Sequence, residues 1–175
     1  MAVLQEVPPW WPATLASACG AQHRAALTSR NAVAGARRAI AARRPDLLGA
    51  NGGGANVILV RGAIVAHARL RLRTWPERRV VHAIALPDGT WVANVHASTR
   101  PAARIRADVA RAGSALMGWA RGAPAVLAGD FNLRDPQVPG FTAAAGHEVD
   151  HVLARGLERD GPAQTLVGGA LSDHA

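Results

Sequence analysis

Two apolar runs separated by a three-residue turn place the strongest constraint on the fold of this chain. Residues 80–86 and 90–96 have the composition of strands, and Pro87-Asp88-Gly89 joins them. Glycine takes the positive φ that a tight turn requires, so the two runs are expected to pair antiparallel. Residues 64–74 precede them with alternating apolar and polar side chains, which is typical of a strand with one buried face. The chain is therefore predicted to contain an antiparallel sheet.

A helix is predicted soon after this hairpin. Pro101 is suited to the first helical position, and apolar residues then recur at steps of four and three as far as Trp119. The arginines between them are expected on the outer face, together with Asp108. A helix with one apolar stripe lies on a sheet, so the pattern favours a strand-rich α/β fold.

The other candidate elements are shorter or less regular. Residues 11–44 are rich in alanine and are predicted to be helical, with Asn31 as a cap and Pro45 as a stop. Further strands are expected in residues 1–7, 55–60, 124–128 and 149–154.

Composition sets the class of protein. The 175 residues, 49% hydrophobic and 18% charged, suit one globular domain over residues 1–175. No apolar stretch approaches the roughly 18 to 20 uncharged residues of a membrane span, and the first residues lack the layout of a signal peptide. The single cysteine, Cys19, excludes an internal disulfide and a cysteine metal cluster. The default expectation is a soluble, cytoplasmic protein.

The charge balance points to anionic partners. The formal net charge is +8, and all 20 basic residues are arginine. A positive excess favours nucleic acids, anionic lipids or phosphorylated metabolites, and the guanidinium fork suits phosphate. The bias of an alanine- and arginine-rich genome is the alternative explanation, so charge alone does not select a function.

Residues 125–132 carry the most specific chemical signal. An apolar strand leads into Gly129-Asp130-Phe131-Asn132, and a spacing of two residues puts the Asp130 carboxylate and the Asn132 carboxamide on one side. Phe131 is expected to point the opposite way, and Gly129 allows a close approach of backbone or ligand. Taken alone, the segment is equally typical of a strand that ends in an Asp/Asn turn.

Four other segments place carboxylates or imidazoles at predicted strand ends or side by side. Carboxylates in such positions are costly unless they hold a metal ion, a proton or a histidine. The segments are Gln5-Glu6, Asn94-Val95-His96, Val149-Asp150-His151 and Ser172-Asp173-His174.

In this order, the five motifs resemble the endonuclease/exonuclease/phosphatase superfamily, which has the deoxyribonuclease I-like fold. The resemblance covers nearly the whole chain, and residues 55–61 are similar to a strand that lies between the first two motifs of that family. It implies a four-layer α/β/β/α sandwich and phosphoester hydrolysis that depends on Mg²⁺ or Mn²⁺. The implied function is that of a metal-dependent phosphodiesterase or nuclease-type hydrolase.

The resemblance also implies the metal ligands. Glu6 takes the place of the main Mg²⁺ ligand, and Asp173 assists in the metal shell. Mg²⁺ suits such a site because it binds few protein carboxylates and keeps water and substrate phosphate oxygens as its other ligands.

The catalytic roles are carried over residue by residue. Asp130 orients or deprotonates the attacking water, and Asn132 helps to hold the phosphoryl oxygens. His96 and His174 donate to the phosphate as charge builds in the transition state. Asp150 pairs with His174 and keeps it oriented and cationic. Which of these groups takes the proton stays open.

The ends of the chain differ from the family pattern. The family begins with a strand that carries an Asn and then a helix, whereas Met1 lies where the Glu-bearing strand is already under way. The family also continues past the Ser-Asp-His motif into an apolar strand, whereas this chain stops at Ala175. The sandwich is therefore expected to lack the usual first strand and helix and the last strand, and a truncated, inactive member is the alternative to an active enzyme.

A zinc metalloprotease is a remote alternative. His147-Glu148-Val149-Asp150-His151 matches H-E-x-x-H, which requires both histidines on one face of a helix with the glutamate as base. Asp150 argues against this interpretation, because it places a charge where the buried helix carries uncharged residues.

A basic protein that binds phosphate or nucleic acid without catalysis is the other class. Two groups of side chains are candidates to follow a phosphate backbone, and a solvated outer face is the plainer reading of both. They are Arg69, Arg71 and Arg73 with Trp75, and Arg37, Arg38, Arg43 and Arg44. A pure binder has no use for the ordered acidic and histidine motifs. The substrate stays open between nucleic acid, inositol phosphate and a phospholipid head group, with nucleic acid the first to test.

Overall fold

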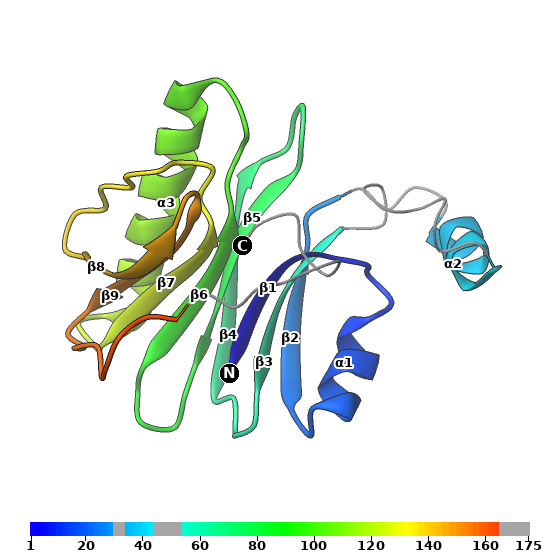
Figure 1. Ribbon diagram of the computed structural model, residues 1–175, viewed down its shortest axis with the longest axis horizontal. Helices are drawn as coiled ribbons and strands as arrows, with labels where there is room; N and C mark the ends of the chain where they lie inside the picture. Colours follow the sequence, from blue (N-terminus) through cyan, green and yellow to red (C-terminus); the bar gives the residue numbers. More distant parts are fainter. Residues whose placement is uncertain (30–33, 44–53, 165–175) are drawn as a thin grey trace.

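The computed structural model describes residues 1–29, 34–43 and 54–164, which form three helices and nine strands (Figure 1). Six residues singled out from the sequence lie outside these ranges. They are Asn31, Arg44, Pro45, Ser172, Asp173 and His174.

Three antiparallel strands form the smaller sheet. They are β1 (Ala2–Val7), β2 (Gln22–Leu27) and β3 (Ala55–Val60), in the order β1-β3-β2. The central strand β3 is buried along its whole length, which explains its continuous apolar sequence. Helix α1 (Pro12–Ala18) packs on the outer face of this sheet through Leu15 and Ala16.

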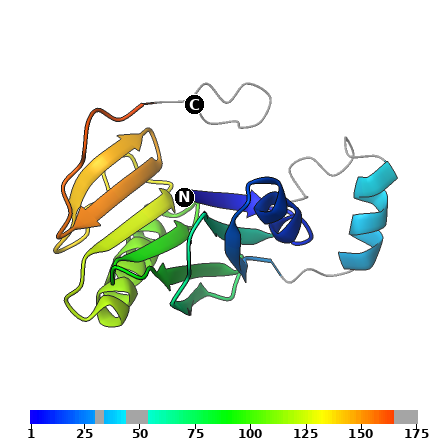
Figure 2. The ribbon, with the colours of Figure 1, turned by 90° about the horizontal axis from the view of Figure 1, so that it is seen from below.

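The prediction of one helical stretch over residues 11–44 is wrong. In the described part of this segment, α1 and α2 (Ala34–Arg43) are helical, and β2 lies between them. Alanine and arginine favour a helix, but β2 pairs with β3 along its whole length, and this tertiary pairing outweighs local propensity. Helix α2 lies apart from both sheets (Figures 1 and 2).

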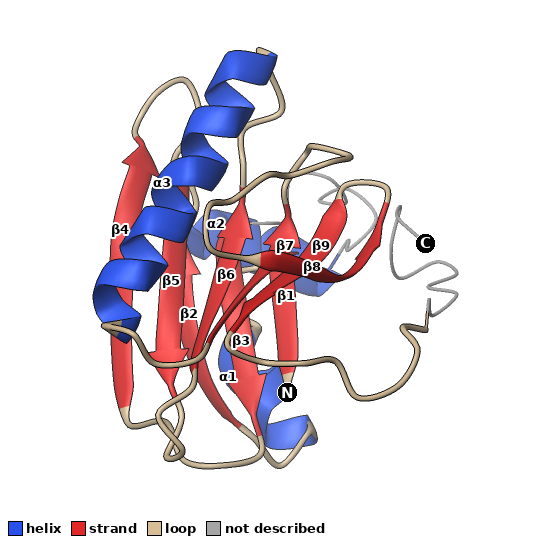
Figure 3. Cartoon of the chain, turned by 90° about the vertical axis from the view of Figure 1, so that its left-hand side faces the viewer, coloured by secondary structure: helices blue, strands red, loops and turns tan. Residues whose placement is uncertain are grey.

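Six strands form the larger sheet, in the order β4-β5-β6-β7-β9-β8. They are β4 (Ala66–Arg73), β5 (Arg79–Ala85), β6 (Trp91–His96), β7 (Ala125–Asp130), β8 (Thr142–His147) and β9 (Asp150–Arg155). The predicted hairpin is confirmed, because β5 and β6 pair antiparallel. β6 and β7 are parallel and run in the same direction in Figure 3. Parallel neighbours need a crossover, which helix α3 (Ala102–Ala120) supplies.

The H-E-x-x-H motif forms a β-hairpin. His147 ends β8 and His151 lies in β9, while Glu148 and Val149 make the turn between them. His147 and Asp150 face each other across the two strands. The zinc-protease hypothesis requires a helix here, so it is wrong.

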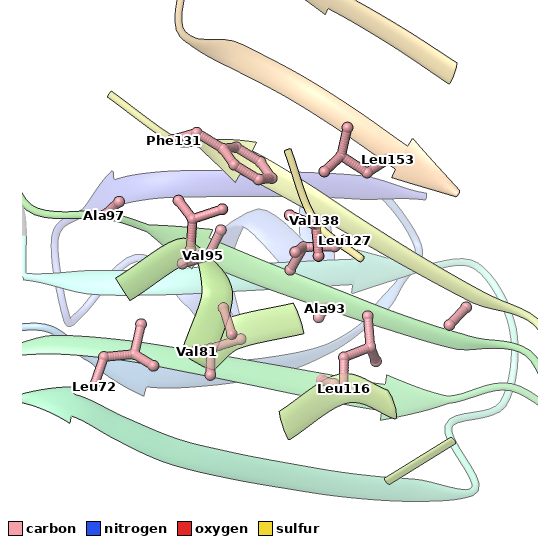
Figure 4. Packing of buried hydrophobic residues seen from close by; sticks show 14 of the residues in the cluster. Leu72, Val81, Ala93, Val95, Ala97, Leu116, Leu127, Phe131, Val138 and Leu153 are labelled. Atoms are coloured by element: carbon pink, nitrogen blue, oxygen red, sulfur yellow. The ribbon is translucent and has the colours of Figure 1, made fainter. Parts of the chain in front are cut away.

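Helix α3 lies across the outer face of the larger sheet and closes the main core (Figures 3 and 4). Its predicted apolar stripe is confirmed, and Leu116 is completely buried against strand residues that include Val95 and Leu127. Phe131, directly after β7, is also completely buried in this core. Each such side chain contributes roughly 1.5–3 kcal/mol relative to an exposed position.

Asp108 does not lie on the outer face of α3, as expected from the charge pattern, but is completely buried. Its Oδ2 accepts hydrogen bonds from the Ser98 amide (3.2 Å) and the Ser98 hydroxyl (2.6 Å), and its Oδ1 accepts one from Arg73 (3.1 Å). A buried carboxylate is tolerated when it is paired and hydrogen-bonded in this way. Arg73 is therefore part of the fold and not of a free arginine row.

The layers follow the order α3, larger sheet, smaller sheet, α1 (Figure 1). Between the two sheets lie Ile58 and Val60 of β3 and Ile84 and Val92 of the larger sheet. The predicted four-layer α/β/β/α sandwich is confirmed. Among the described residues, no helix has the length and apolar character needed to cross a membrane.

Candidate active site

Polar residues from three neighbouring strands meet at one end of the larger sheet. His96 and Asp130 are the last residues of β6 and β7, and they are register partners in this parallel pair. Asp150 begins the antiparallel strand β9 and lies opposite Asp130. Residues in register point to the same face of a sheet, so the three side chains form one row.

His96 lies between two carboxylates. Its Nε2 is 3.4 Å from Asp130 Oδ2, and its Nδ1 is 4.0 Å from Glu6 Oε1. The His96 side chain is only 7% exposed. Because Glu6 belongs to the smaller sheet and Asp130 to the larger one, the imidazole joins acidic groups from both sheets.

Glu6 reaches this position through an irregularity in β1. The pairing of β1 with β3 shifts between Leu4 and Val7, and Glu6 takes a φ of 54°. A left-handed conformation costs a residue with a side chain about 1–2 kcal/mol. The glutamate side chain is 68% exposed, so its carboxylate faces solvent beside His96.

Asn94 connects the two sheets beneath this carboxylate. Its side-chain amide nitrogen donates to Leu4 O (2.8 Å) and Val57 O (3.0 Å), and its Oδ1 accepts from Gln5 Nε2 (2.9 Å). Sequence reasoning placed Asn94 and Gln5 in motifs but missed this role. Their positions in the sequence were the available signal, because Gln5 directly precedes Glu6 and Asn94 lies two residues before His96.

The turn after β7 holds Asp130 from several sides. The Asn132 amide donates to Asp130 Oδ1 (2.8 Å), and the Asn132 side-chain nitrogen donates to Ala97 O (3.2 Å). The Ala97 amide in turn donates to the backbone oxygen of Asp130 (2.9 Å). These contacts fix the turn against the segment that follows β6, and the expected inward orientation of Phe131 is confirmed.

Gly129 permits a close backbone approach. A Cβ at this position would lie 2.0 Å from the Val95 carbonyl oxygen and 3.0 Å from Gln5 Nε2, and the glycine has a φ of 134°. No side chain fits there. The prediction that Gly129 allows a close approach is thus confirmed, and the group that approaches it is the backbone of Val95.

His151 does not share the row of Asp150. Its Nε2 donates to Leu133 O (2.8 Å), and its ring meets Phe131 edge to face at 5.6 Å. The structure therefore brings together Glu6, His96, Asp130, Asn132 and Asp150 of the predicted site residues, whereas Asp173 and His174 lie outside the described ranges.

The donors present suit a hard cation. Within residues 1–29, 34–43 and 54–164, no three His, Cys, Asp or Glu side chains are grouped to hold a metal ion. Mg²⁺ takes only one or two protein carboxylates and fills its other positions with water and substrate oxygens. The exposed Glu6 carboxylate fits such a ligand.

Two other histidines form a pair at the edge of the larger sheet, where His82 of β5 is buried and His67 of the edge strand β4 is exposed. His67 Nε2 lies 3.2 Å from His82 Nδ1, and their rings meet edge to face. Burial, with a smaller effect of His67, lowers the pKa of His82 to about 3. Burial also lowers the pKa of His67, and the nearby guanidinium groups of Arg24 and Arg69 add to this shift. The His82 imidazole is therefore neutral at neutral pH.

Several solved structures are similar to this chain in fold. TDP2 from Caenorhabditis elegans aligns with a TM-score of 0.59 and 13% identity, covering 89% of this chain and 53% of that chain. The human Nocturnin catalytic domain with bound sulfate anion gives 0.56 and 17%, covering 88% of this chain and 68% of that chain. A humanized D. rerio TDP2 gives 0.56 and 13%, covering 98% of this chain and 80% of that chain.

The present chain spans about half the length of the C. elegans TDP2 chain. At these identities the likeness shows the fold. A comparison with curated protein sequences gave no match.

The sequence also matches a family model along nearly its whole length. The model of the Endonuclease/Exonuclease/phosphatase family aligns with residues 2–174, a range that contains all five motifs. The four-layer sandwich and the meeting of motifs from both sheets at one end agree with this match. The chain therefore belongs to the endonuclease/exonuclease/phosphatase family.

Proposed function

We propose that the protein is a divalent-metal-dependent phosphoesterase that hydrolyses phosphodiester bonds, with nucleic acid as the first substrate to test. The observation that carries this proposal is the position of His96 between Asp130 at 3.4 Å and Glu6 at 4.0 Å. Membership of the family supports the reaction class. The positive net charge supports a polyanionic substrate.

Glu6 is proposed to hold Mg²⁺ or Mn²⁺, assisted by Asp173. When bound, the ion supplies positive charge that polarises a phosphoryl oxygen and offsets the charge of the transition state. The solvent exposure of the Glu6 carboxylate supports this role, because water and substrate oxygens must reach the same ion.

The other side chains act on water and phosphate. Asp130 is proposed to orient the attacking water and take its proton, and the hydrogen bond from the Asn132 amide keeps its carboxylate in place. His96 is proposed to donate to a phosphoryl oxygen as negative charge develops. Asn132 is proposed to help hold the phosphoryl group, and Asp150 to keep His174 oriented and cationic.

Hydrolysis of bis(p-nitrophenyl) phosphate and of a labelled oligonucleotide tests the proposal. Activity is expected with Mg²⁺ or Mn²⁺, and EDTA is expected to remove it. Asp130→Asn is expected to lower kcat by about 10²-fold or more, because it removes the proposed base. Asp160→Asn, an exposed carboxylate outside the site, serves as the matched control and is expected to leave the rate unchanged.

Three results would contradict the proposal. They are hydrolysis that survives EDTA, hydrolysis that requires Zn²⁺, and a full rate in Asp130→Asn. Oligonucleotide binding without any turnover would instead support the non-catalytic binding protein. Parallel assays with an inositol phosphate and with sphingomyelin vesicles test the other two substrate classes.

A further inference from the structure

A cavity of about 300 Å³ lies at the same end of the larger sheet as the candidate active site. Its walls come from the turn between β4 and β5 and from the loop between β6 and α3, with Glu77, Thr99, Arg100 and Arg104 among the lining residues. The loop begins directly after His96, and its first residue, Ala97, is hydrogen-bonded to Asp130 and Asn132. The cavity wall therefore begins at Ser98, two residues after His96.

The charge of the cavity is positive. Arg100 is exposed and Arg104 is partly exposed. The one carboxylate in the wall, that of Glu77, is paired with Arg79. Within the described parts of the chain, no carboxylate lies within ion-pairing distance of Arg100 or Arg104. Two guanidinium groups are thus available to an anion, and phosphate is the anion that fits their fork best.

The loop that carries Arg100 is held rigidly. Ser98 is 4% exposed, and both its amide and its hydroxyl donate to the buried Asp108 carboxylate. Arg73 donates to the other oxygen of the same carboxylate. The backbone of the cavity wall is therefore fixed at Ser98, which lowers the entropy lost by this segment when a ligand binds.

An exposed aromatic residue precedes the cavity wall in the sequence. Trp75 precedes Pro76, which lines the cavity wall, and 69% of its surface is exposed. Indole faces stack on nucleobases with little regard to base identity. An exposed tryptophan next in sequence to the wall of a positive cavity suits a nucleotide unit better than an inositol phosphate, which has no base.

We propose that this cavity is a substrate subsite for an unpaired nucleic-acid strand, in which Arg100 and Arg104 bind the phosphate next to the scissile one and Trp75 stacks on the adjoining base. The inference rests on the proposed function and narrows its substrate class to single-stranded nucleic acid.

The test combines binding without turnover and steady-state kinetics. A fluorescein-labelled 12-nucleotide single strand is titrated in EDTA, and the anisotropy gives Kd at several salt concentrations. Arg100→Gln/Arg104→Gln is expected to weaken binding by about 10-fold or more and to reduce the salt slope by about 0.7 for each lost phosphate contact. Trp75→Ala is expected to weaken binding by about 10-fold. Arg106→Gln, an exposed arginine of α3 outside the cavity, is the matched control.

Kinetics separate the subsite from the reaction itself. With Mg²⁺, the double variant is expected to raise KM for the oligonucleotide while its rate on bis(p-nitrophenyl) phosphate stays at the wild-type value, because the small diester does not reach the cavity. Arg100→Lys/Arg104→Lys keeps the charge but loses the fork, and is expected to recover only part of the affinity. Equal thermal midpoints of the variants exclude misfolding.

The outcomes distinguish the two proposals. An unchanged oligonucleotide Kd in the double variant overturns the subsite, whatever the enzyme hydrolyses. An unchanged Kd in Trp75→Ala overturns the stacking. A wild-type protein that hydrolyses no diester overturns the proposed function, whereas weaker binding by the double variant in EDTA, with Arg106→Gln unchanged, still supports a strand-binding site.

Discussion

The side-chain amide of Gln5 donates a 2.9 Å hydrogen bond to the Asn94 side-chain oxygen, from the smaller sheet to the larger one. The side-chain nitrogen of Asn94 in turn donates hydrogen bonds to backbone oxygens of β1 and β3. Glu6, directly after Gln5, and His96, two residues after Asn94, lie 4.0 Å apart at the candidate site. The position of one sheet relative to the other is therefore fixed where the proposed chemistry needs it.

Asn94→Ala is expected to destabilise the protein and loosen this contact. It leaves the oxygens of Leu4 and Val57 without their donor, and each buried unsatisfied group costs about 1–3 kcal/mol. The free energy of unfolding, measured by urea denaturation, should fall by about 2–4 kcal/mol. The Mg²⁺ concentration for half-maximal rate should rise as well. A decrease in the free energy of unfolding of less than about 0.5 kcal/mol would show that the Asn94 side chain does not hold the two sheets together.

Glu6 is expected to bind the metal ion and to have a strained backbone. Glu6→Gln keeps the shape of the side chain but removes the charge, so it should raise the Mg²⁺ concentration required for half-maximal rate about 10-fold or more. Glu6→Gly removes the side chain and accepts the φ of 54° without penalty. We expect Glu6→Gly to unfold at the same or a higher urea concentration than the wild type and to have lost activity. A clearly less stable glycine variant would argue against backbone strain at this position.

Gly129→Ala is expected to be severely destabilising. The new Cβ would lie 2.0 Å from the Val95 carbonyl oxygen, and neither backbone segment is able to move without breaking the β6–β7 pairing. The expected loss exceeds about 4 kcal/mol, which is seen as insoluble or unfolded protein. Gly118→Ala in the exposed part of α3 is the control, because nothing lies within 4 Å of its Cβ. Helix propensity predicts a gain of up to about 1 kcal/mol there.

Stability is expected to depend on pH through His82. Its pKa is lowered from 6.5 to about 3 in the folded protein, so the unfolded chain binds more protons between these values. Stability is therefore complete above about pH 6.5 and falls as the solution is made more acidic. From pH 7.5 to pH 5 the expected loss is about 2 kcal/mol. Urea denaturation across this range checks the sign, and His82→Leu should flatten the profile. An equally steep profile in His82→Leu would assign the effect to other groups.

The helices and strands that the sequence predicted well are those whose conformation depends mainly on nearby residues in the sequence. The strand of residues 55–60 and the helix after Pro101 follow from continuous apolar runs and regular spacing, which are local signals. Strand β2 was missed because its sequence favours a helix and only the free edge of β3 makes it a strand. Asp108 was placed on the wrong face because its partners, Ser98 and Arg73, come from segments that meet only in the folded protein.

The same limit applies to the candidate site. The motifs identified Glu6, His96 and Asp130, but their meeting depends on the parallel register of β6 with β7 and on the irregular end of β1. No spacing along the chain encodes that register. The hydrogen bond between Gln5 and Asn94 and the pairing of His67 with the buried His82 were missed for the same reason, because each joins residues of different strands.

The parallel pairing of β6 with β7 has a consequence for protein engineering. His96 and Asp130 occupy opposed positions on adjacent strands, so their separation is set by the backbone ladder, whose strands lie about 4.7–4.9 Å apart. The segments of residues 74–78 and 99–101 lie beyond the last rung of that ladder, whereas hydrogen bonds tie Ala97 to Asp130 and Ser98 to Asp108. Substitutions confined to these two segments are therefore expected to change the surface around the proposed site while the backbone ladder keeps His96 and Asp130 in place.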